Sequence, residues 1–178
     1  LLEGKGALVT GASGWLGGAI AVKLASEGAS IGVHYNATKS NAEKICEDIR
    51  VAGGLGTPIQ ADVTDSSQVQ RMFDDLEREY GPVDILVNNA GILRPTRLID
   101  IEEDEWDLVV DANLKSTYLC SRAVVRPMRD SGWGRIVNFS SSAGRQYSTL
   151  GGSHYTAAKA GILGCPRHLA NDRAAKGI

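Results

Sequence analysis

Two side chains near the end of the sequence could exchange a proton with a substrate oxygen. Tyr155 and Lys159 stand four residues apart, so a helix places them on one face. An ammonium group beside a phenol favours the phenolate and lowers the phenol pKa from about 10 toward neutral pH. Such a tyrosine can pass a proton to or from a carbonyl or alcohol oxygen while hydride moves to or from a nicotinamide. The same spacing also arises by chance on exposed helices, so the pair alone does not establish a catalytic site.

A glycine-rich run near the start of the chain could hold the phosphates of a nucleotide. It comprises residues 10–17 (Thr-Gly-Ala-Ser-Gly-Trp-Leu-Gly) and follows the apolar run 7–9. Glycine weakens regular secondary structure, so the cluster indicates that a ligand approaches the main chain closely. Where a strand passes into a helix, free N–H groups and the helix dipole attract a pyrophosphate. The alternative is a turn whose glycines serve only the close packing of helix on strand.

The glycines of this run have separate expected roles. Gly11 would permit the tight turn, while Gly14 and Gly17 would let the pyrophosphate and the helix come close. The residues expected to contact the cofactor here are Gly11, Ser13, Gly14, Trp15, Leu16 and Gly17.

If a dinucleotide cofactor binds at the glycine-rich run, the end of the second predicted strand should lie beside its adenosine ribose. An Asp or Glu there would accept hydrogen bonds from both ribose hydroxyls and would repel a 2′-phosphate. This chain has Tyr35 and Asn36 at that point instead, with Lys39 close behind. The missing carboxylate favours NADP(H) over NAD(H), and Asn36 or Lys39 would meet the extra phosphate. Alternatively, Lys39 is a solvated charge at the start of a helix.

These residues must be positioned by strands and helices that alternate along the chain. Apolar runs of strand length cover residues 6–10, 30–35, 57–61, 83–87 and 135–139. Helical spacing covers residues 16–26 and 40–51, 101–128 with a break near Asn113, and 155–175 apart from Pro166. A further helix is expected after Ser66 or Ser67, either of which would cap it, and its apolar face would comprise Val69, Met72, Phe73 and Leu76. Strands that are apolar on both faces imply helices on each side of a parallel sheet. We therefore predict an α/β fold, a Rossmann-type doubly wound parallel sheet in three α/β/α layers. Residues 1–178 would form a single dinucleotide-binding domain that also carries the catalytic residues.

The composition is that of an ordinary globular protein. The 178 residues are 43% hydrophobic and 22% charged, with a formal net charge of −2. A net charge of this size and sign lacks the excess of positive charge that is typical of proteins that bind nucleic acid or an anionic membrane. No apolar stretch is long enough to span a bilayer, and the first residues lack a signal-peptide pattern. We therefore expect neither a nucleic-acid nor a membrane partner.

Cysteine and histidine positions point away from disulfide and metal sites. The three cysteines are Cys46, Cys120 and Cys165. An odd, dispersed set is typical of reduced thiols in a cytoplasmic protein, and we expect Cys165 to be buried as a small apolar residue, with a reactive thiol as the alternative. The three histidines, which lack metal-like spacing with carboxylates or cysteines, are His34, His154 and His168. The chemistry is therefore expected to use no metal.

Five short motifs occur in order along the chain. They are Asp62-Val63 after the third predicted strand, Asn88-Asn89-Ala90-Gly91 after the fourth, Asn113 within Asp-Ala-Asn-Leu, Ser141 at the end of residues 134–141, and Tyr155-Thr156-Ala157-Ala158-Lys159. With them the chain resembles the short-chain dehydrogenase/reductase family over essentially its whole length. Ser140 and Ser142 flank Ser141, so the position of the active-site serine could slip by one.

The resemblance implies a role for each motif. Ser141 would hydrogen-bond the substrate oxygen and Tyr155 would donate the proton. Lys159 would lower the tyrosine pKa and hold the nicotinamide ribose hydroxyls, while Asn113 would support a water relay to the lysine. The motif residues expected to contact the cofactor are Asp62 and Val63 at the adenine, with Asn89, Ala90, Gly91, Tyr155 and Lys159. The alternatives are that Ser141 is an ordinary strand-end hydroxyl and that Asn113 only kinks a helix.

Two features depart from the family pattern. The loop spacing Thr-Gly-x-x-Gly-x-x-Gly resembles the longer branch of the family, which acts on nucleotide sugars, and places Trp15 where the shorter branch has glycine. The indole would either cover the pyrophosphate or pack on the surface. Family members also continue beyond the residues that match Ile178, so the C-terminal strands of the sheet are expected to be missing.

The combined interpretation is an NADP(H)-dependent oxidoreductase that interconverts a ketone and a secondary alcohol. The resemblance points most nearly to 3-oxoacyl-(acyl carrier protein) reductases and related sugar or polyol dehydrogenases. It also implies a homodimer or homotetramer, formed through residues 101–129 and 155–175. One alternative is a catalytically silent, truncated dinucleotide-binding module. Another is a nucleotide-sugar epimerase or dehydratase, which rests on the glycine spacing alone.

Overall fold

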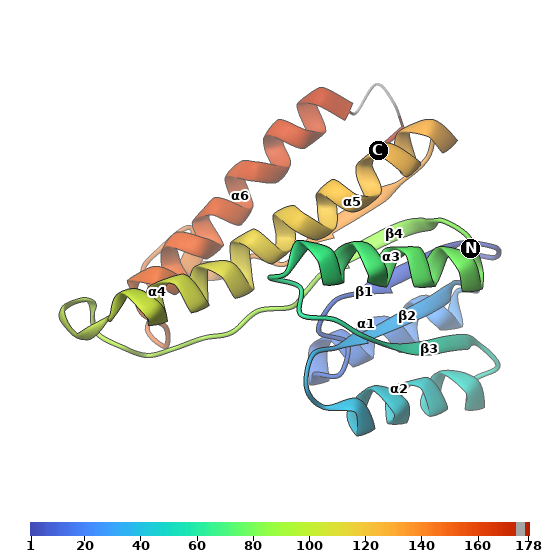
Figure 1. The fold of residues 1–178 in the computed structure, drawn as a ribbon, viewed down its shortest axis with the longest axis horizontal. Coiled ribbons are helices and arrows are strands. Elements are labelled where there is room, and N and C mark those ends of the chain that lie inside the picture. The colour runs from blue at the N-terminus through green and yellow to red at the C-terminus, as the bar shows by residue number, and fades with distance from the viewer. Residues whose placement is uncertain (174–176) are drawn as a thin grey trace.

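The computed structural model describes residues 1–173 and 177–178 and contains one parallel sheet with the strand order β3-β2-β1-β4-β5 (Figure 1). The strands are β1 (Gly6–Val9), β2 (Ser30–Tyr35), β3 (Leu55–Gln60), β4 (Val83–Asn88) and β5 (Arg135–Asn138). The order reverses between β1 and β4, which lie side by side although two strands separate them in sequence. Ligands of open α/β sheets bind beside such a reversal, at the carboxyl ends of the strands.

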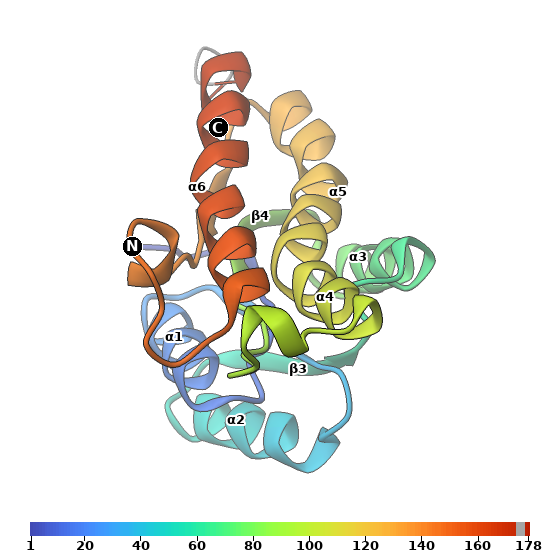
Figure 2. The ribbon, with the colours of Figure 1, turned by 90° about the vertical axis from the view of Figure 1, so that its left-hand side faces the viewer.

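Helices cover both faces of this sheet, as the views in Figures 1 and 2 show. They are α1 (Trp15–Ser26), α2 (Lys39–Val51), α3 (Ser66–Tyr80), α4 (Glu103–Val110), α5 (Ser116–Ser131) and α6 (Ser153–Arg173). The predicted doubly wound, three-layer architecture is confirmed. The third strand begins two residues earlier than expected, and the long central helical region runs further, to Ser131. Within the described residues, no helix combines the length and apolar character that crossing a membrane would need.

Alternation along β1 explains why both faces are buried. Leu8 packs in the cluster that holds the apolar face of α3, whereas Ala7 and Val9 pack in the cluster formed with α1 and α2. Successive strand side chains point to opposite faces, so a strand buried on both sides must be apolar throughout. The central strands therefore form a rigid platform whose carboxyl ends carry the polar loops.

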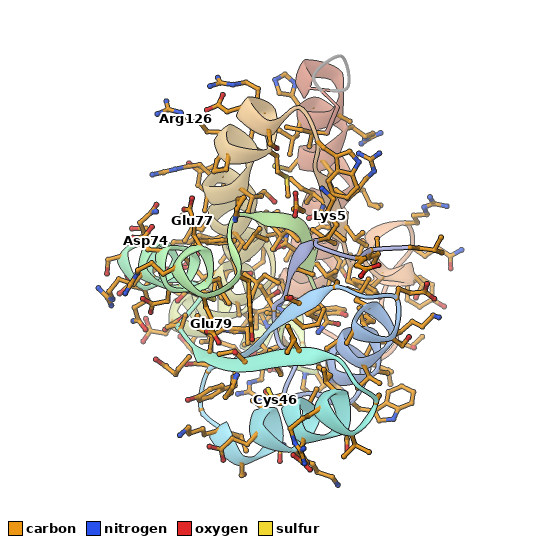
Figure 3. All side chains as sticks on the ribbon, turned by 90° about the vertical axis from the view of Figure 1, so that its right-hand side faces the viewer. Lys5, Cys46, Asp74, Glu77, Glu79 and Arg126 are labelled. Carbon is orange, nitrogen blue, oxygen red and sulfur yellow. The ribbon has the colours of Figure 1, made fainter. Side chains whose placement is uncertain are left out.

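Helix α3 shows the expected amphipathic pattern. Its predicted apolar face is buried against the sheet through Val69, Met72, Phe73 and Leu76. Asp74 and Glu77 lie on the exposed side, where Figure 3 labels them.

The N-cap of α3 differs from the prediction. Asp65 caps this helix, because its carboxylate accepts hydrogen bonds from the backbone N–H groups of Ser67 and Gln68. The hydrogen bond from the Ser67 hydroxyl, together with these backbone bonds and one from the Gln68 side chain, lowers the pKa of Asp65 to about 2. The prediction of Ser66 or Ser67 as the cap is therefore wrong. An aspartate directly before the two serines offers a charged acceptor to the free N–H groups of the first helical turn.

Helix α6 runs beside α5 and continues through Pro166 (Figure 1). Proline has no N–H, so the bond that this position would make to the carbonyl of Ile162 is absent. The helix begins at Ser153, and residues 174 and 175 of the predicted range lie outside the described residues.

The prediction that Cys165 is buried is wrong, because the side chain is exposed. It is in helical phase with buried Ala158, but this half of α6 lies beside α5 (Figure 1), and Cys165 lines the open groove between those two helices. The other two cysteines are less accessible: Cys120 is buried and Cys46 partly so.

Candidate active site

The glycine-rich loop leaves β1 and passes beneath the start of α1. Gly11 adopts φ +66°, a left-handed conformation that favours glycine. A methyl group at Gly17 would lie 2.5 Å from the Gly11 carbonyl oxygen and 2.7 Å from Asn89 Nδ2. Loop packing alone therefore accounts for these two glycines. At Gly14, the N-cap of α1, a methyl group would meet only the Gly11 oxygen, at 3.3 Å, so this position leaves open space in front of the helix.

That open space faces helix-terminal N–H groups. Among the described residues no side chain caps α1, so its first-turn N–H groups can bind an anion. The indole of Trp15, which opens the helix, is 91% exposed. The indole therefore lies at the molecular surface, and its role over a pyrophosphate stays a prediction. Leu16 is also partly exposed and lines the pocket described below.

A buried histidine on β2 fixes the glycine-rich loop. The backbone N–H of Gly11 donates to His34 Nδ1 over 2.8 Å, and His34 Nε2 lies 3.0 Å from the Ala61 carbonyl oxygen. The Ser13 N–H donates to the backbone oxygen of the same histidine over 3.3 Å. Burial lowers the pKa of His34, which keeps the imidazole neutral with Nδ1 as an acceptor. Sequence reasoning missed this contact, although a polar residue inside an apolar strand was its visible signal.

The loop after β4 is tied to the same turn. The backbone N–H groups of Asn89 and Ala90 both donate to Thr10 Oγ1 over 3.0 Å. Asn89 Nδ2 returns a 3.0 Å bond to the Thr10 carbonyl oxygen. Thr10, which was not among the predicted site residues, thus joins the ends of β1 and β4 across the point where the strand order reverses.

At the predicted ribose end, the side chains differ in accessibility. Tyr35 is buried, whereas Asn36 and Lys39 are exposed. Lys39 opens α2 and pairs with Glu43 over 3.1 Å, and this hydrogen bond raises the lysine pKa. A 2′-phosphate at Lys39 would have to compete with that surface pair.

The predicted adenine contacts lie after β3. The Asp62 carboxylate accepts hydrogen bonds from the N–H and the hydroxyl of Thr64, over 2.9 and 2.7 Å, and so stabilises its own turn. The side chain of Val63 is buried in the cluster with α3.

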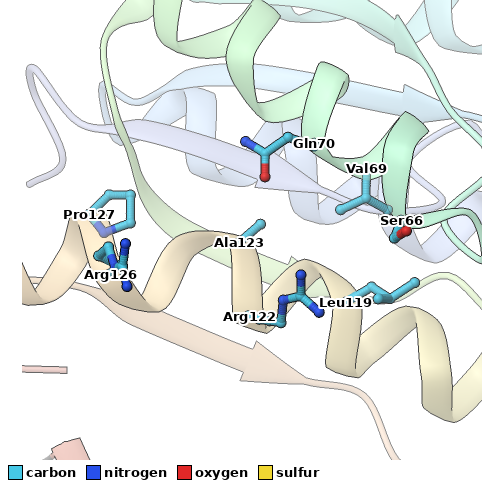
Figure 4. Close-up of a pocket in the computed structure, with 8 residues that line it drawn as sticks. All are labelled: Ser66, Val69, Gln70, Leu119, Arg122, Ala123, Arg126 and Pro127. Carbon is cyan, nitrogen blue, oxygen red and sulfur yellow. The ribbon is translucent and has the colours of Figure 1, made fainter.

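Several predicted site residues meet in one pocket of about 230 Å³ at the carboxyl ends of β4 and β5. Its lining residues are Leu16, Asn89, Gly91, Ile92, Leu93, Asn113, Phe139, Ser140, Tyr155 and Lys159. A larger groove of about 490 Å³ lies between α3 and α5, with Arg122 and Arg126 as its charged residues (Figure 4). None of the predicted site residues lines that groove.

Lys159 is the buried cation of the pocket. Its ammonium group donates to the Phe139 carbonyl oxygen over 2.9 Å and lies 5.7 Å from the centre of the Tyr155 ring. Burial lowers the pKa of Lys159. Within the described residues no carboxylate pairs with this lysine, so its remaining N–H groups can serve a ligand or water.

Asn113 occupies a π-helical turn, residues Asp111–Lys115, between α4 and α5. Its Nδ2 donates to the carbonyl oxygens of Ile92 and Val109, both over 2.8 Å. The side chain thereby takes the acceptor of an ordinary helical bond and widens the turn, a distortion that often marks functional sites. The prediction of an irregularity near Asn113 is confirmed, but the chain stays helical through the π turn and does not break there.

The amide oxygen of Asn113 is fully buried and has no hydrogen-bond partner. A methyl group at Gly91 would overlap this oxygen and would lie 3.6 Å from Lys159 Nζ. Glycine at position 91 therefore lets a buried acceptor and a buried ammonium group face the same small space. An unsatisfied acceptor beside a cation fits a bound water or a polar group of a ligand.

The neighbouring serines have different partners. The Ser140 hydroxyl donates to the Lys159 carbonyl oxygen over 2.7 Å and so anchors α6. The Ser141 hydroxyl accepts a 3.2 Å bond from the Ala143 N–H, which leaves its own proton available. This arrangement favours Ser141 over Ser140 as the substrate-binding hydroxyl, although Ser140 and not Ser141 lines the pocket.

Comparison with known proteins agrees with this geometry. The family model for short chain dehydrogenases matches residues 5–178. The chain belongs to this family. The short-chain dehydrogenases are oxidoreductases that act on CH–OH groups with NAD(P), and the chain shares that activity class.

Curated relatives of this dehydrogenase carry a more specific name. The 3-oxoacyl-[acyl-carrier-protein] reductase FabG of Staphylococcus aureus is 40% identical over 98% of this chain, and that of Salmonella typhimurium is 41% identical over 99%. The chain spans 70% of the length of each. A short-chain type dehydrogenase/reductase from Mycobacterium marinum superposes with a TM-score of 0.94 at 32% identity, over 99% of this chain and 72% of that one.

Proposed function

We propose that the protein is an NADP(H)-dependent reductase that interconverts a ketone and a secondary alcohol, with 3-oxoacyl thioesters as the substrate class. The observation that carries this proposal is the shared pocket of Tyr155, Lys159 and Asn113 beside the glycine-rich loop. The names of the FabG relatives support the substrate class.

The bound cofactor would supply or accept the hydride. The N–H groups at the start of α1, with Gly14 leaving space before them, would hold its pyrophosphate. Asn89, Ala90 and Gly91 would border the nicotinamide half, because the Asn89 and Ala90 backbone is fixed next to the loop.

The chain itself would move the proton. Tyr155 would give its phenolic proton to the carbonyl oxygen during reduction, and the Ser141 hydroxyl would hydrogen-bond the same oxygen. Lys159 would stabilise the phenolate through its charge and would bind the ribose hydroxyls with the N–H groups not used by Phe139. The free oxygen of Asn113 would hold a water that returns the proton toward Lys159.

We also propose that two or four copies assemble. A groove between α5 and α6 carries apolar side chains on an accessible face, among them half-exposed Tyr118 and exposed Cys165. A cytoplasmic location agrees with the cysteines, all of which are free thiols.

The test is NADPH oxidation by the full-length protein, followed at 340 nm with acetoacetyl-coenzyme A. Tyr155→Phe should abolish turnover but leave NADPH binding intact. Tyr147→Phe is the matched control, because it removes a hydroxyl from an exposed tyrosine in the preceding loop. Turnover by Tyr155→Phe at the wild-type rate would refute the proposal. NADPH binding without turnover by the wild-type protein would favour the silent binding module, and turnover of a nucleotide sugar the epimerase alternative.

A further inference from the structure

A second buried histidine stands directly before the proposed proton donor. His154 is fully buried at the start of α6. Its Nδ1 accepts a 2.9 Å hydrogen bond from the backbone N–H of Tyr155, and its Nε2 lies 3.0 Å from Glu105 Oε1 on α4. The His154 ring therefore joins the backbone of Tyr155 to the carboxylate of Glu105, which lies 49 residues before the histidine in sequence.

These contacts define which ring nitrogen carries the proton. Nδ1 accepts from a backbone N–H, so it must hold a free lone pair. Nε2 then carries the proton and donates it to Glu105. A carboxylate behind an imidazole fixes both the tautomer and the plane of the ring, as it does where histidines serve as metal ligands or bases.

Glu105 is itself held in place. Hydrogen bonds from the Thr96 side chain and from His154 lower the pKa of this carboxyl group. Thr96 belongs to the loop after β4, so Glu105 connects that loop, helix α4 and the start of α6. The ring of Trp106, the next residue on α4, lies 6.3 Å from the His154 ring.

The backbone around the ring leaves it little room to turn. A methyl group at Gly152 would lie 2.7 Å from His154 Cε1 and 2.6 Å from the Thr96 carbonyl oxygen. The Gly152 N–H donates to the Arg94 carbonyl oxygen over 2.8 Å, which presses this turn against the loop after β4. The imidazole is thus enclosed and bonded at both nitrogens.

We propose that Glu105 and His154 form a positioning pair for Tyr155. The pair fixes the backbone N–H at the first turn of α6, and with it the direction in which the phenol enters the pocket. Neither residue lines the pocket, so both act through Tyr155 rather than on the substrate. The inference rests on the proposed function, in which Tyr155 is the proton donor.

Substitutions can separate the two bonds of the ring. In His154→Asn the side-chain oxygen can occupy the place of Nδ1 and accept from Tyr155, but the side chain is too short to reach Glu105. In His154→Gln the terminal amide can reach Glu105, but no acceptor stands at the Nδ1 position. Glu105→Ala removes the carboxylate, whereas Glu105→Gln retains an oxygen that accepts from Nε2.

The experiment measures kcat and KM for acetoacetyl-coenzyme A, the NADPH dissociation constant and hydrogen exchange of the Tyr155 amide in the full-length protein. We expect His154→Gln and Glu105→Ala to lower kcat about 10- to 100-fold, because misplacement of a reacting group by about 1 Å has effects of this size. KM and NADPH binding should change less than about threefold, because no substrate or cofactor contact is removed. His154→Asn and Glu105→Gln should recover most of the lost kcat.

Amide exchange gives a readout that does not need turnover. The Tyr155 amide should exchange faster in His154→Gln than in the wild type or in His154→Asn. Glu103→Ala, on the exposed face of the same helix, is the matched control and should leave every value unchanged.

The outcomes distinguish this inference from the proposed function. If Tyr155→Phe is inactive while His154→Gln and Glu105→Ala keep wild-type kcat, the positioning pair is refuted and the proposed function stands. If Tyr155→Phe is active, the proposed function fails, and only the exchange result then bears on the pair. If His154→Gln does not fold, Glu105→Ala against Glu105→Gln decides, and equal kcat in these two variants would overturn the inference.

Discussion

Gly17→Ala offers a direct test of the packing beneath the proposed cofactor loop. The added methyl group would lie 2.5 Å from the Gly11 carbonyl oxygen, 2.7 Å from Asn89 Nδ2 and 2.9 Å from Ala12 Cα. Two of these neighbours are backbone atoms, which cannot rotate away as a flexible side chain can. The methyl group would therefore push α1 away from the loop.

The free-energy change combines two opposing effects. Overpacking of this kind costs about 1–3 kcal/mol. Alanine in a helix gains about 1 kcal/mol over glycine, which offsets part of that cost. Because the clash is with backbone, we expect a net loss of about 1–2 kcal/mol in the free energy of unfolding. For a chain of this size, that corresponds to a fall in Tm of roughly 2–8 °C.

Gly164→Ala is the matched control within a helix of the same molecule. No heavy atom lies within 4 Å of a methyl group there, and the glycine has no positive φ. This change should raise the free energy of unfolding by about 0.4–1 kcal/mol. Because α6 belongs to the proposed oligomer face, unfolding is measured at two protein concentrations.

Urea unfolding followed by tryptophan fluorescence gives both free energies, and NADPH titration gives the affinity of the loop. We expect Gly17→Ala to weaken NADPH binding at least tenfold and Gly164→Ala to leave it unchanged. A Gly17→Ala protein as stable as the wild type would refute the reasoning, because it would mean that the loop yields without cost.

Three further predictions concern single polar groups. Burial lowers the pKa of His34 in the folded state, and the hydrogen bond to the Ala61 carbonyl and the charge of Asp62 oppose this shift only in part. Below about pH 6.5 the unfolded chain therefore binds a proton that the folded chain does not. The free energy of unfolding should decrease as the pH is lowered, by up to about 1.4 kcal/mol per pH unit, until the lowered pKa is reached. Urea unfolding at several pH values between 7.5 and 5 gives the free energy of unfolding as a function of pH. This dependence should be shallower for His34→Asn than for the wild type, and an identical dependence would contradict the role of His34. Asn113→Ala should lower the free energy of unfolding by about 1–3 kcal/mol, because the carbonyls of Ile92 and Val109 lose their donor. Thermal denaturation that matches the wild type would contradict the stabilisation of the π turn by this side chain. Lys39→Ala should raise the NADPH dissociation constant about two- to fivefold with little effect on NADH, because an exposed charge pair is screened by water and contributes little. Equal changes for both cofactors would leave Lys39 as a surface charge.

Local patterns in the sequence were enough to predict the fold. The period of the apolar residues distinguishes strands from helices. It identified the buried face of α3 because the apolar residues of this helix recur at helical spacing and so share one face. The irregularity at Asn113 was also visible, because a polar residue interrupts an otherwise continuous helical pattern. The structure adds that the interruption is a π turn stabilised by the asparagine side chain itself.

Contacts between distant elements could not be predicted in this way. His34 and His154 are each isolated among unrelated neighbours in sequence, and their bonds to Gly11 and Tyr155 depend on ring orientation. Cys165 has the helical phase of a buried residue, yet its burial depends on which element packs against that part of α6. The spacing of residues within one helix does not give this information. The roles of the individual site residues remain predictions for the same reason, because hydride and proton transfer depend on a bound geometry.

The hydrogen bonds around the pocket indicate where its chemistry would take place. Among the described residues, the buried side-chain polar atoms without a partner are Asn113 Oδ1 and Ser153 Oγ. An unpaired buried polar group costs about 1–3 kcal/mol, so a fold that satisfies the surrounding groups retains such an atom only where it has another use. Asn113 Oδ1 lies across Gly91 from the buried ammonium of Lys159, and Ser153 precedes His154 at the start of α6. Ser153 stands two residues before Tyr155, and Asn113 Oδ1 faces the Lys159 ammonium, so under the proposed function both unsatisfied atoms would border the path of the proton.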